Sequence, residues 1–90
     1  MIRPLLALVL LLASHSVFSQ ELSQYTATRV QKAHQLAQDE NIKEAIDTLK
    51  QIETSRPYDQ AFVARMLGVF LWQDDQPQAA IEALNQAVAS

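Results

Sequence analysis

After Leu22, apolar and small side chains recur three or four positions apart in four successive segments. Such spacing places one apolar stripe along each segment and predicts amphipathic helices. The predicted helices cover about 23–38, 42–54, 58–73 and 77–89. The chain has one glycine and few β-branched runs, which favours helices over sheet. We therefore expect an all-α fold.

Polar residues and prolines mark the predicted helix ends. Asn41 is followed three residues later by Glu44, which predicts a capping box at the start of the second helix. Pro57 is expected to close that helix, because the residue before a proline is pushed out of the helical region. Asp74 or Asp75 is expected to cap the fourth helix, with Pro77 in its first turn.

The segments form two similar units when the chain is shifted on itself by thirty-five residues. A small residue then recurs midway along the first helix of each unit and another early in the second helix, with large residues beside them. The matching pairs are Ala33 and Gly68, Leu36 and Leu71, Ala45 and Ala80, Ile46 and Ile81, and Leu49 and Leu84. We expect two tandem antiparallel helix pairs, repeat one over about 24–57 and repeat two over about 59–90.

This pattern resembles the tetratricopeptide repeat (TPR), and the resemblance covers residues 24–89. The matching positions are Ala33, Leu36, Ala45, Leu49 and Pro57 in repeat one, and Leu67, Gly68, Leu71, Ala80, Leu84 and Ala87 in repeat two. The early aromatic of the family is replaced by Arg29 and Ala64, Lys32 replaces a leucine, and the spacing is one residue longer than usual. The resemblance implies the start of an α-solenoid that binds other proteins. The alternative interpretation is an unrelated four-helix bundle.

A narrower resemblance rests on two short stretches, 22–26 and 64–73. They look like the start of the periplasmic TPR proteins found with some TonB–ExbB–ExbD energy-transduction systems, which are several times longer. This likeness implies an accessory role in TonB-dependent transport.

The first nineteen residues read as an export signal. Arg3 gives a positive start, residues 5–13 form an apolar run, and residues 14–19 are mostly small and polar. Val17 and Ser19 suit a signal peptidase, so we expect cleavage after Ser19 and a periplasmic domain over 20–90. An uncleaved anchor is the alternative, although the run is about half the roughly twenty residues that span a bilayer.

The remaining composition favours binding over catalysis. The net charge is −3, and charges of both signs alternate along the helices, so no basic stripe for nucleic acid is present. Cysteine is absent, and His34 is the one histidine outside the leader, so we expect no metal site and no cofactor. Asp74 and Asp75 lie in a predicted turn and need no catalytic role. We expect no enzyme activity and no small-molecule substrate.

The TPR resemblance implies a concave groove lined by the first helix of each pair. In repeat one these positions are Val30, His34, Ala37 and Gln38, and in repeat two they are Phe62, Arg65, Val69, Trp72 and Gln73. Residues 62, 66, 69, 70 and 73 share one broad side of a helix. Tryptophan and arginine are enriched in binding hot spots. Trp72 has a second interpretation, in which it packs against the preceding pair.

Two units are fewer than a stable repeat array usually has. The fourth predicted helix also carries Ile81, Leu84 and Val88 with no later helix to cover them. The chain is therefore expected to be the front of a longer protein, to self-associate, or to fold on a partner. The leading hypothesis is a scaffold for a protein of the cell envelope. Its rival is a small structural oligomer, or a truncated fragment with no independent activity.

Overall fold

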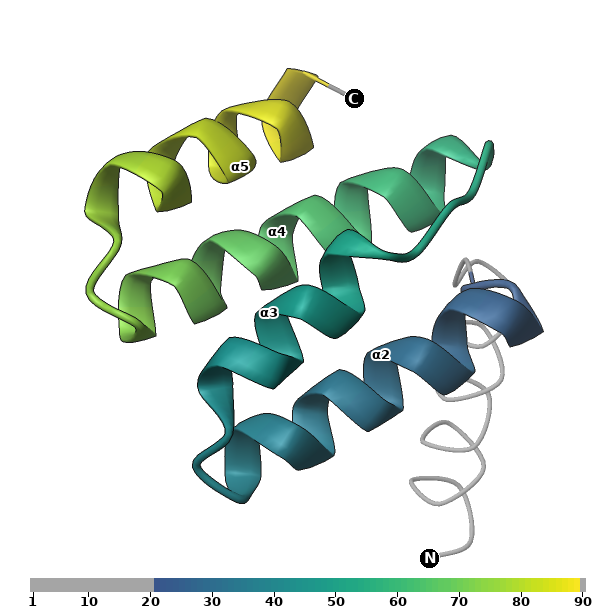
Figure 1. The fold of residues 1–90 in the computed structure, drawn as a ribbon. Coiled ribbons are helices and arrows are strands. Elements are labelled where there is room, and N and C mark those ends of the chain that lie inside the picture. The colour runs from purple at the N-terminus through teal and green to yellow at the C-terminus, as the bar shows by residue number, and fades with distance from the viewer. Residues whose placement is uncertain (1–20, 90) are drawn as a thin grey trace, which may run out of the picture.

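The computed structural model describes residues 21–89, which form four helices and contain no strand. The helices are α2 (Gln24–Gln38), α3 (Ile42–Lys50), α4 (Pro57–Gln73) and α5 (Pro77–Ala89). They form two antiparallel pairs in tandem, α2 with α3 and α4 with α5 (Figure 1). The all-α fold with tandem helix pairs is confirmed. The predicted export signal lies outside the described residues.

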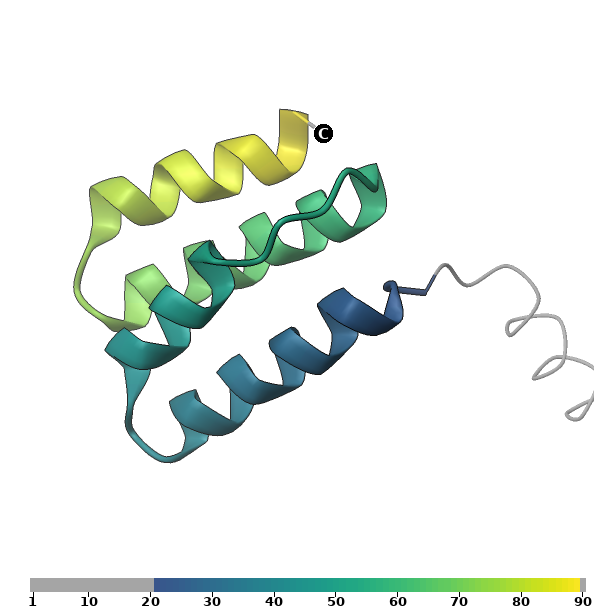
Figure 2. The ribbon, with the colours of Figure 1, turned by 45° about the vertical axis from the view of Figure 1, so that its right-hand side comes forward.

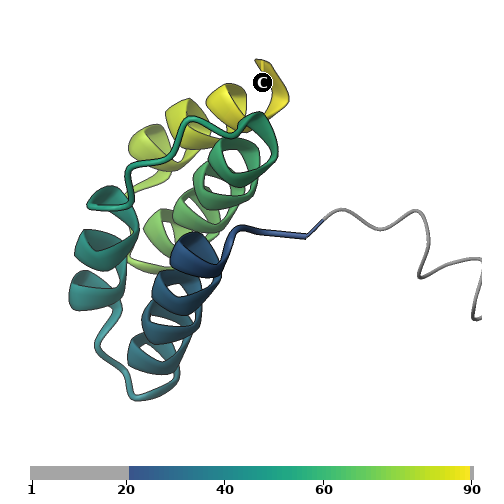
Figure 3. The same cartoon turned by 90° about the vertical axis from the view of Figure 1, so that its right-hand side faces the viewer.

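The second pair follows the first with a similar orientation (Figure 2). α4 packs against α5, against α3 and, more lightly, against α2. In the view along the helices, α2 and α4 lie on one side and α3 and α5 on the other (Figure 3). Among the described helices, α5 contacts α4 alone.

The core lies where α4 meets the first pair and where the helices of each pair meet. Small residues allow the close approach within each pair: Ala33 and Ala45 are fully buried in the first, and Gly68 and Ala80 are buried in the second. At Gly68 a Cβ atom would lie 2.6 Å from Cγ of Leu84, so only glycine fits while Leu84 keeps its position. The small and large residues that recur in the two units are therefore the residues through which the two helices of each pair pack.

The turns inside the two pairs have the same backbone structure, thirty-five residues apart. Glu40, two residues after the end of α2, has φ 66°, and Asp75, two residues after the end of α4, has φ 62°. In the first turn the N–H of Asn41 bonds the carbonyl of Leu36, and in the second the N–H of Gln76 bonds that of Leu71. Both are helix C-termini closed by a left-handed residue, a place where glycine is usual.

α3 and α5 begin where predicted, but the predicted caps of both helices are wrong. Asn41 precedes α3, but its side chain makes no cap hydrogen bond, because the turn holds it at ψ 59° and outside the extended region that caps adopt. Asp74 is instead the C-cap of α4, and its carboxylate accepts hydrogen bonds from Lys43 and Gln76. Asp75 is the left-handed turn residue, and Gln76 directly precedes α5.

α3 is shorter than predicted, and Pro57 has the opposite role. The helix ends at Lys50, and residues 52–56 are a non-helical connection. The Thr54 hydroxyl accepts from the N–H of Arg56, a local bond that competes with helix. Pro57 does not end α3 but is the first residue of α4, where its missing N–H leaves no helical bond unmade.

Candidate functional site

A hollow of about 310 Å³ lies between α2 and α4, on the side of the molecule formed by the first helix of each pair. α4 supplies six of its seven lining residues, and α2 supplies one. The lining consists of His34, Phe62, Arg65, Met66, Val69, Phe70 and Gln73. We call this hollow the groove.

Five of the nine positions predicted for the groove line it. They are His34, Phe62, Arg65, Val69 and Gln73. Gln38 lies one turn beyond His34, with its Nε2 3.3 Å from Nε2 of the imidazole, and so continues the edge of the groove along α2.

The other predicted residues lie elsewhere. Val30 is buried in the core. Ala37 is half-buried and packs against that core. Trp72 is 64 % exposed and does not line the groove.

Met66 and Phe70 line the groove although they were not among the predicted site residues. They follow Phe62 at four-residue intervals and therefore share its side of α4. The sequence showed that shared side, but it did not show that the hollow reaches so far toward the first pair. Phe70 is buried and Met66 is half-buried, so they form the floor.

The groove combines an apolar floor with a polar edge. The Arg65 guanidinium lies 5.2 Å from the centre of the Phe62 ring, a cation–π contact that holds the side chain beside the hollow. No carboxylate is among the lining residues. In the part of the chain that the structure describes, no three His, Cys, Asp or Glu side chains are grouped to hold a metal ion. The groove is thus suited to apolar side chains accompanied by an anionic or hydrogen-bonding group.

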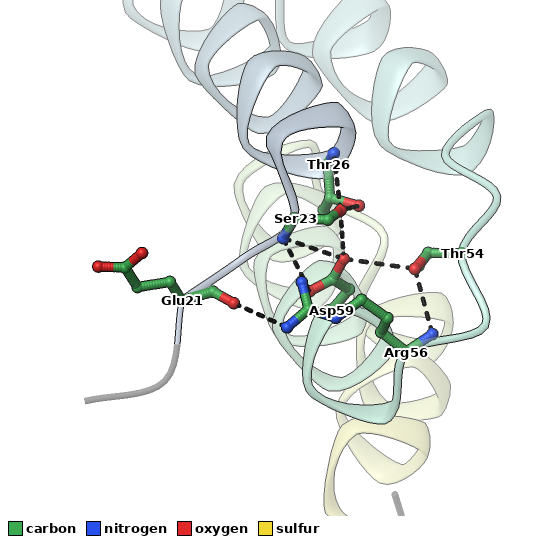
Figure 4. Close-up of polar contacts among 6 residues, drawn as sticks. All are labelled: Glu21, Ser23, Thr26, Thr54, Arg56 and Asp59. Atoms are coloured by element: carbon green, nitrogen blue, oxygen red, sulfur yellow. Dashed lines mark hydrogen bonds and ion pairs between the residues drawn. The ribbon is translucent and has the colours of Figure 1, made fainter. Parts of the chain in front are cut away.

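A second polar site lies at the far end of α4, around the fully buried carboxylate of Asp59 (Figure 4). Asp59 Oδ2 accepts a 2.7 Å hydrogen bond from the Ser23 hydroxyl and a 3.3 Å bond from the Thr54 hydroxyl. Arg56 Nη1 lies 3.3 Å from Oδ1, and its Nη2 donates to the carbonyl of Glu21. This cluster joins the start of α2, the connection after α3 and the start of α4.

Burial of Asp59 would raise the pKa of its carboxyl group, but its neighbours outweigh that effect. Hydrogen bonds from Ser23 and Thr26 and the positive charge of Arg56 favour the ionised form, so the pKa is lowered. No buried side-chain nitrogen or oxygen of the described residues lacks a hydrogen-bond partner. The fully bonded Asp59 carboxylate is therefore a structural link between the two pairs. This link was not predicted from the sequence, because its partners are up to thirty-six residues away.

Comparisons of the chain with protein-family models, with curated proteins and with solved structures find no match. Within residues 21–89, no helix is long and apolar enough to cross a membrane.

Proposed function

We propose that this chain is an exported, periplasmic scaffold of the TPR type that binds a protein of the cell envelope in the groove between α2 and α4. The observation that carries the proposal is the groove itself. Its apolar floor lies on the side formed by the first helix of each pair, and five of the nine residues expected there from the TPR resemblance line it.

The chemistry of the groove indicates the kind of partner. Phe62, Met66, Val69 and Phe70 offer an apolar surface, and Arg65 and His34 offer donors beside it. A peptide segment with apolar side chains and a nearby carboxylate would match both features. The narrower form of the proposal, an accessory of TonB-dependent transport, rests on the likeness of stretches 22–26 and 64–73.

Site-specific photo-crosslinking tests the groove. A photoreactive amino acid at Val69, which is half-exposed in the groove, is expected to capture a defined envelope protein in cells. The matched control position is Lys32, which is exposed and lies nearly opposite His34 on α2. Arg65→Glu should abolish the product from position 69 while the chain remains folded. Identical products from both positions, or no product from position 69, would contradict the proposal.

Export is tested separately, on the N-terminal residue of the protein recovered from the periplasm. Cleavage after Ser19 predicts that the recovered chain begins at Gln20. A chain that stays in the cytoplasm would contradict the periplasmic proposal, and a membrane-bound chain that retains Met1 would favour an anchor.

A further inference from the structure

The surface at the end of the second helix pair is apolar and uncovered in the described part of the chain. α4 presents three residues seven positions apart along one line, and α5 presents three more at helical spacing. We call this the end surface, and its residues are Tyr58, Arg65 and Trp72 on α4 with Ile81, Leu84 and Val88 on α5. Between the two helices lies a hollow of about 350 Å³ lined by Tyr58, Ala61, Phe62, Arg65, Leu84, Ala87 and Val88.

The first pair shows what covers such a surface. Ile46 and Leu49 on α3 stand thirty-five residues before Ile81 and Leu84. Ile46 is 4 % exposed and Leu49 is 1 % exposed, against 53 % for Ile81 and 36 % for Leu84. The equivalent of Arg65 is Val30, which is also buried. The element that covers the first pair is α4, a helix that packs on both α2 and α3.

The opposite end of the molecule does not match the end surface. α4 packs on the first pair through the apolar residues Val63, Met66, Leu67 and Phe70. The equivalent residues of α2 are Thr28, Gln31, Lys32 and Gln35, and three of these four positions are occupied by long polar side chains, all of them exposed. A second copy therefore has no apolar stripe on α2 with which to continue the array head to tail.

The charge of the end surface indicates which kind of partner can bind there. Arg65 is the one charged residue among the six, and in the described residues it has no ion pair with a carboxylate. Covering it without a counter-charge would be costly. Where α4 covers the first pair, Asp59 in its first turn accepts a hydrogen bond from Ser23 and lies close to Thr26 of α2. The residues of the second pair equivalent to Ser23 and Thr26 are Tyr58 and Ala61, which line the 350 Å³ hollow together with Arg65.

We propose that the end surface binds an amphipathic helix of a partner protein, oriented like α4. The helix carries apolar residues at the spacing of Val63, Met66, Leu67 and Phe70, and an acidic residue in its first turn. The acidic residue pairs with Arg65, and the apolar stripe covers Ile81, Leu84 and Trp72. This site shares Arg65 and Phe62 with the groove but differs from it in its residues on α5, and it does not depend on the proposed function.

The test uses the chain's own α4 as a probe. A synthetic peptide of residues 57–73 carries Val69→Lys and Trp72→Lys, so it keeps the packing stripe and Asp59 but has no tryptophan. Trp72 is the one tryptophan of the full chain and lies on the end surface, so its emission reports binding directly. Binding is expected to shift that emission to shorter wavelength. Ile81→Lys in the protein should weaken binding at least about tenfold, whereas Gln31→Lys on α2, away from the end surface, should not change it.

A paired comparison tests the acidic residue. Asp59→Asn in the peptide is expected to weaken binding to the unmodified protein about fivefold and to have no such effect on the Arg65→Gln protein. Three results of the peptide experiment would overturn the proposal: no response of Trp72, a response that survives Ile81→Lys, or displacement of the protein's own α4, seen as NMR shifts at Leu49 in place of Leu84. A stable dimer that is broken by Ile81→Lys would assign the surface to a second copy and would also overturn it.

Discussion

The two helix pairs have related sequences and the same turns, yet their equivalent residues lie in different environments. Leu49 is 1 % exposed in the first pair, and Leu84 at the same position of the second is 36 % exposed. The difference comes from α4, which covers the first pair, whereas no described helix covers the second in the same way. Burial in this protein is thus set by the neighbouring pair as much as by the residue itself, as expected for stacked repeats.

Leu49→Ala and Leu84→Ala compare the covered and uncovered positions directly. Leu49→Ala should lower the free energy of unfolding by about 2–5 kcal/mol, because it opens a cavity in a closed core. Leu84→Ala should cost about 1 kcal/mol, because its side chain already contacts water. Urea unfolding of both variants measures the difference. Equal losses would show that the two positions are buried alike in solution.

Asp59→Asn tests the link that joins the pairs, a link with no counterpart at the exposed Gln24 thirty-five residues earlier. At pH 7 the variant should unfold about 5 °C or more below the unmodified chain, because an amide cannot accept all the bonds that the carboxylate accepts. Thermal unfolding followed by circular dichroism gives the midpoint.

The difference in unfolding midpoint between the unmodified chain and Asp59→Asn is expected to depend on pH. Folding lowers the pKa of Asp59 from its ordinary value of 3.8, so the ionised carboxylate stabilises the fold above that pH. That contribution is lost as the pH falls through the folded pKa. The gap between the two unfolding midpoints should therefore be full at pH 7 and should narrow below about pH 4. A gap that is constant from pH 7 to pH 2 would contradict the assignment.

Gly68→Ala tests the close contact of the second pair, where the first pair has Ala33. The change should lower stability by about 1–3 kcal/mol, because the new Cβ would overlap Leu84 and crowd the carbonyl of Ala80. In a Leu84→Ala background the same change should gain up to about 1 kcal/mol from helix propensity. Denaturant unfolding of the four proteins completes the cycle. Additive effects would argue against the contact.

Glu40→Gly and Asp75→Gly test whether the two turns are equivalent in energy as well as in shape. Both residues have positive φ, which costs a side chain roughly 1 kcal/mol and costs glycine little. Each change should raise the free energy of unfolding by up to about 1 kcal/mol, and the two gains should be similar. A gain from only one of the two substitutions would show that the positive-φ residues of the two turns differ in their energetic cost.

Much of the fold followed from the pattern of apolar and small residues. Ala33, Ala45, Gly68 and Ala80 occupy the helix contacts that the repeat analysis expected. Helix ends were harder to predict, because Pro57 and Asp74 each suit two roles and the choice depends on distant partners. Thr54 and Asp59 hold the connection that Pro57 follows, and Lys43 binds Asp74 at 3.1 Å.

Only part of the groove was predicted, because a sequence does not show which side of a helix its neighbour covers. Arg65, Phe62 and Val69 lie on the expected side of α4, because helical periodicity alone places them there. Val30 was expected on the corresponding side of α2 but is buried in the core. A sequence assigns residues to the sides of a helix, whereas the packing of a second helix decides which side stays open.

The sequence by itself determined the helical class, the tandem pairing and the positions at which helices approach closely, since these depend on spacing within about thirty-five residues. Only the tertiary structure decided the buried link at Asp59, the extent of the groove and the uncovered end of α4 and α5. Those features depend on which surfaces meet across the two pairs, and contacts between surfaces leave no periodic signal in the chain.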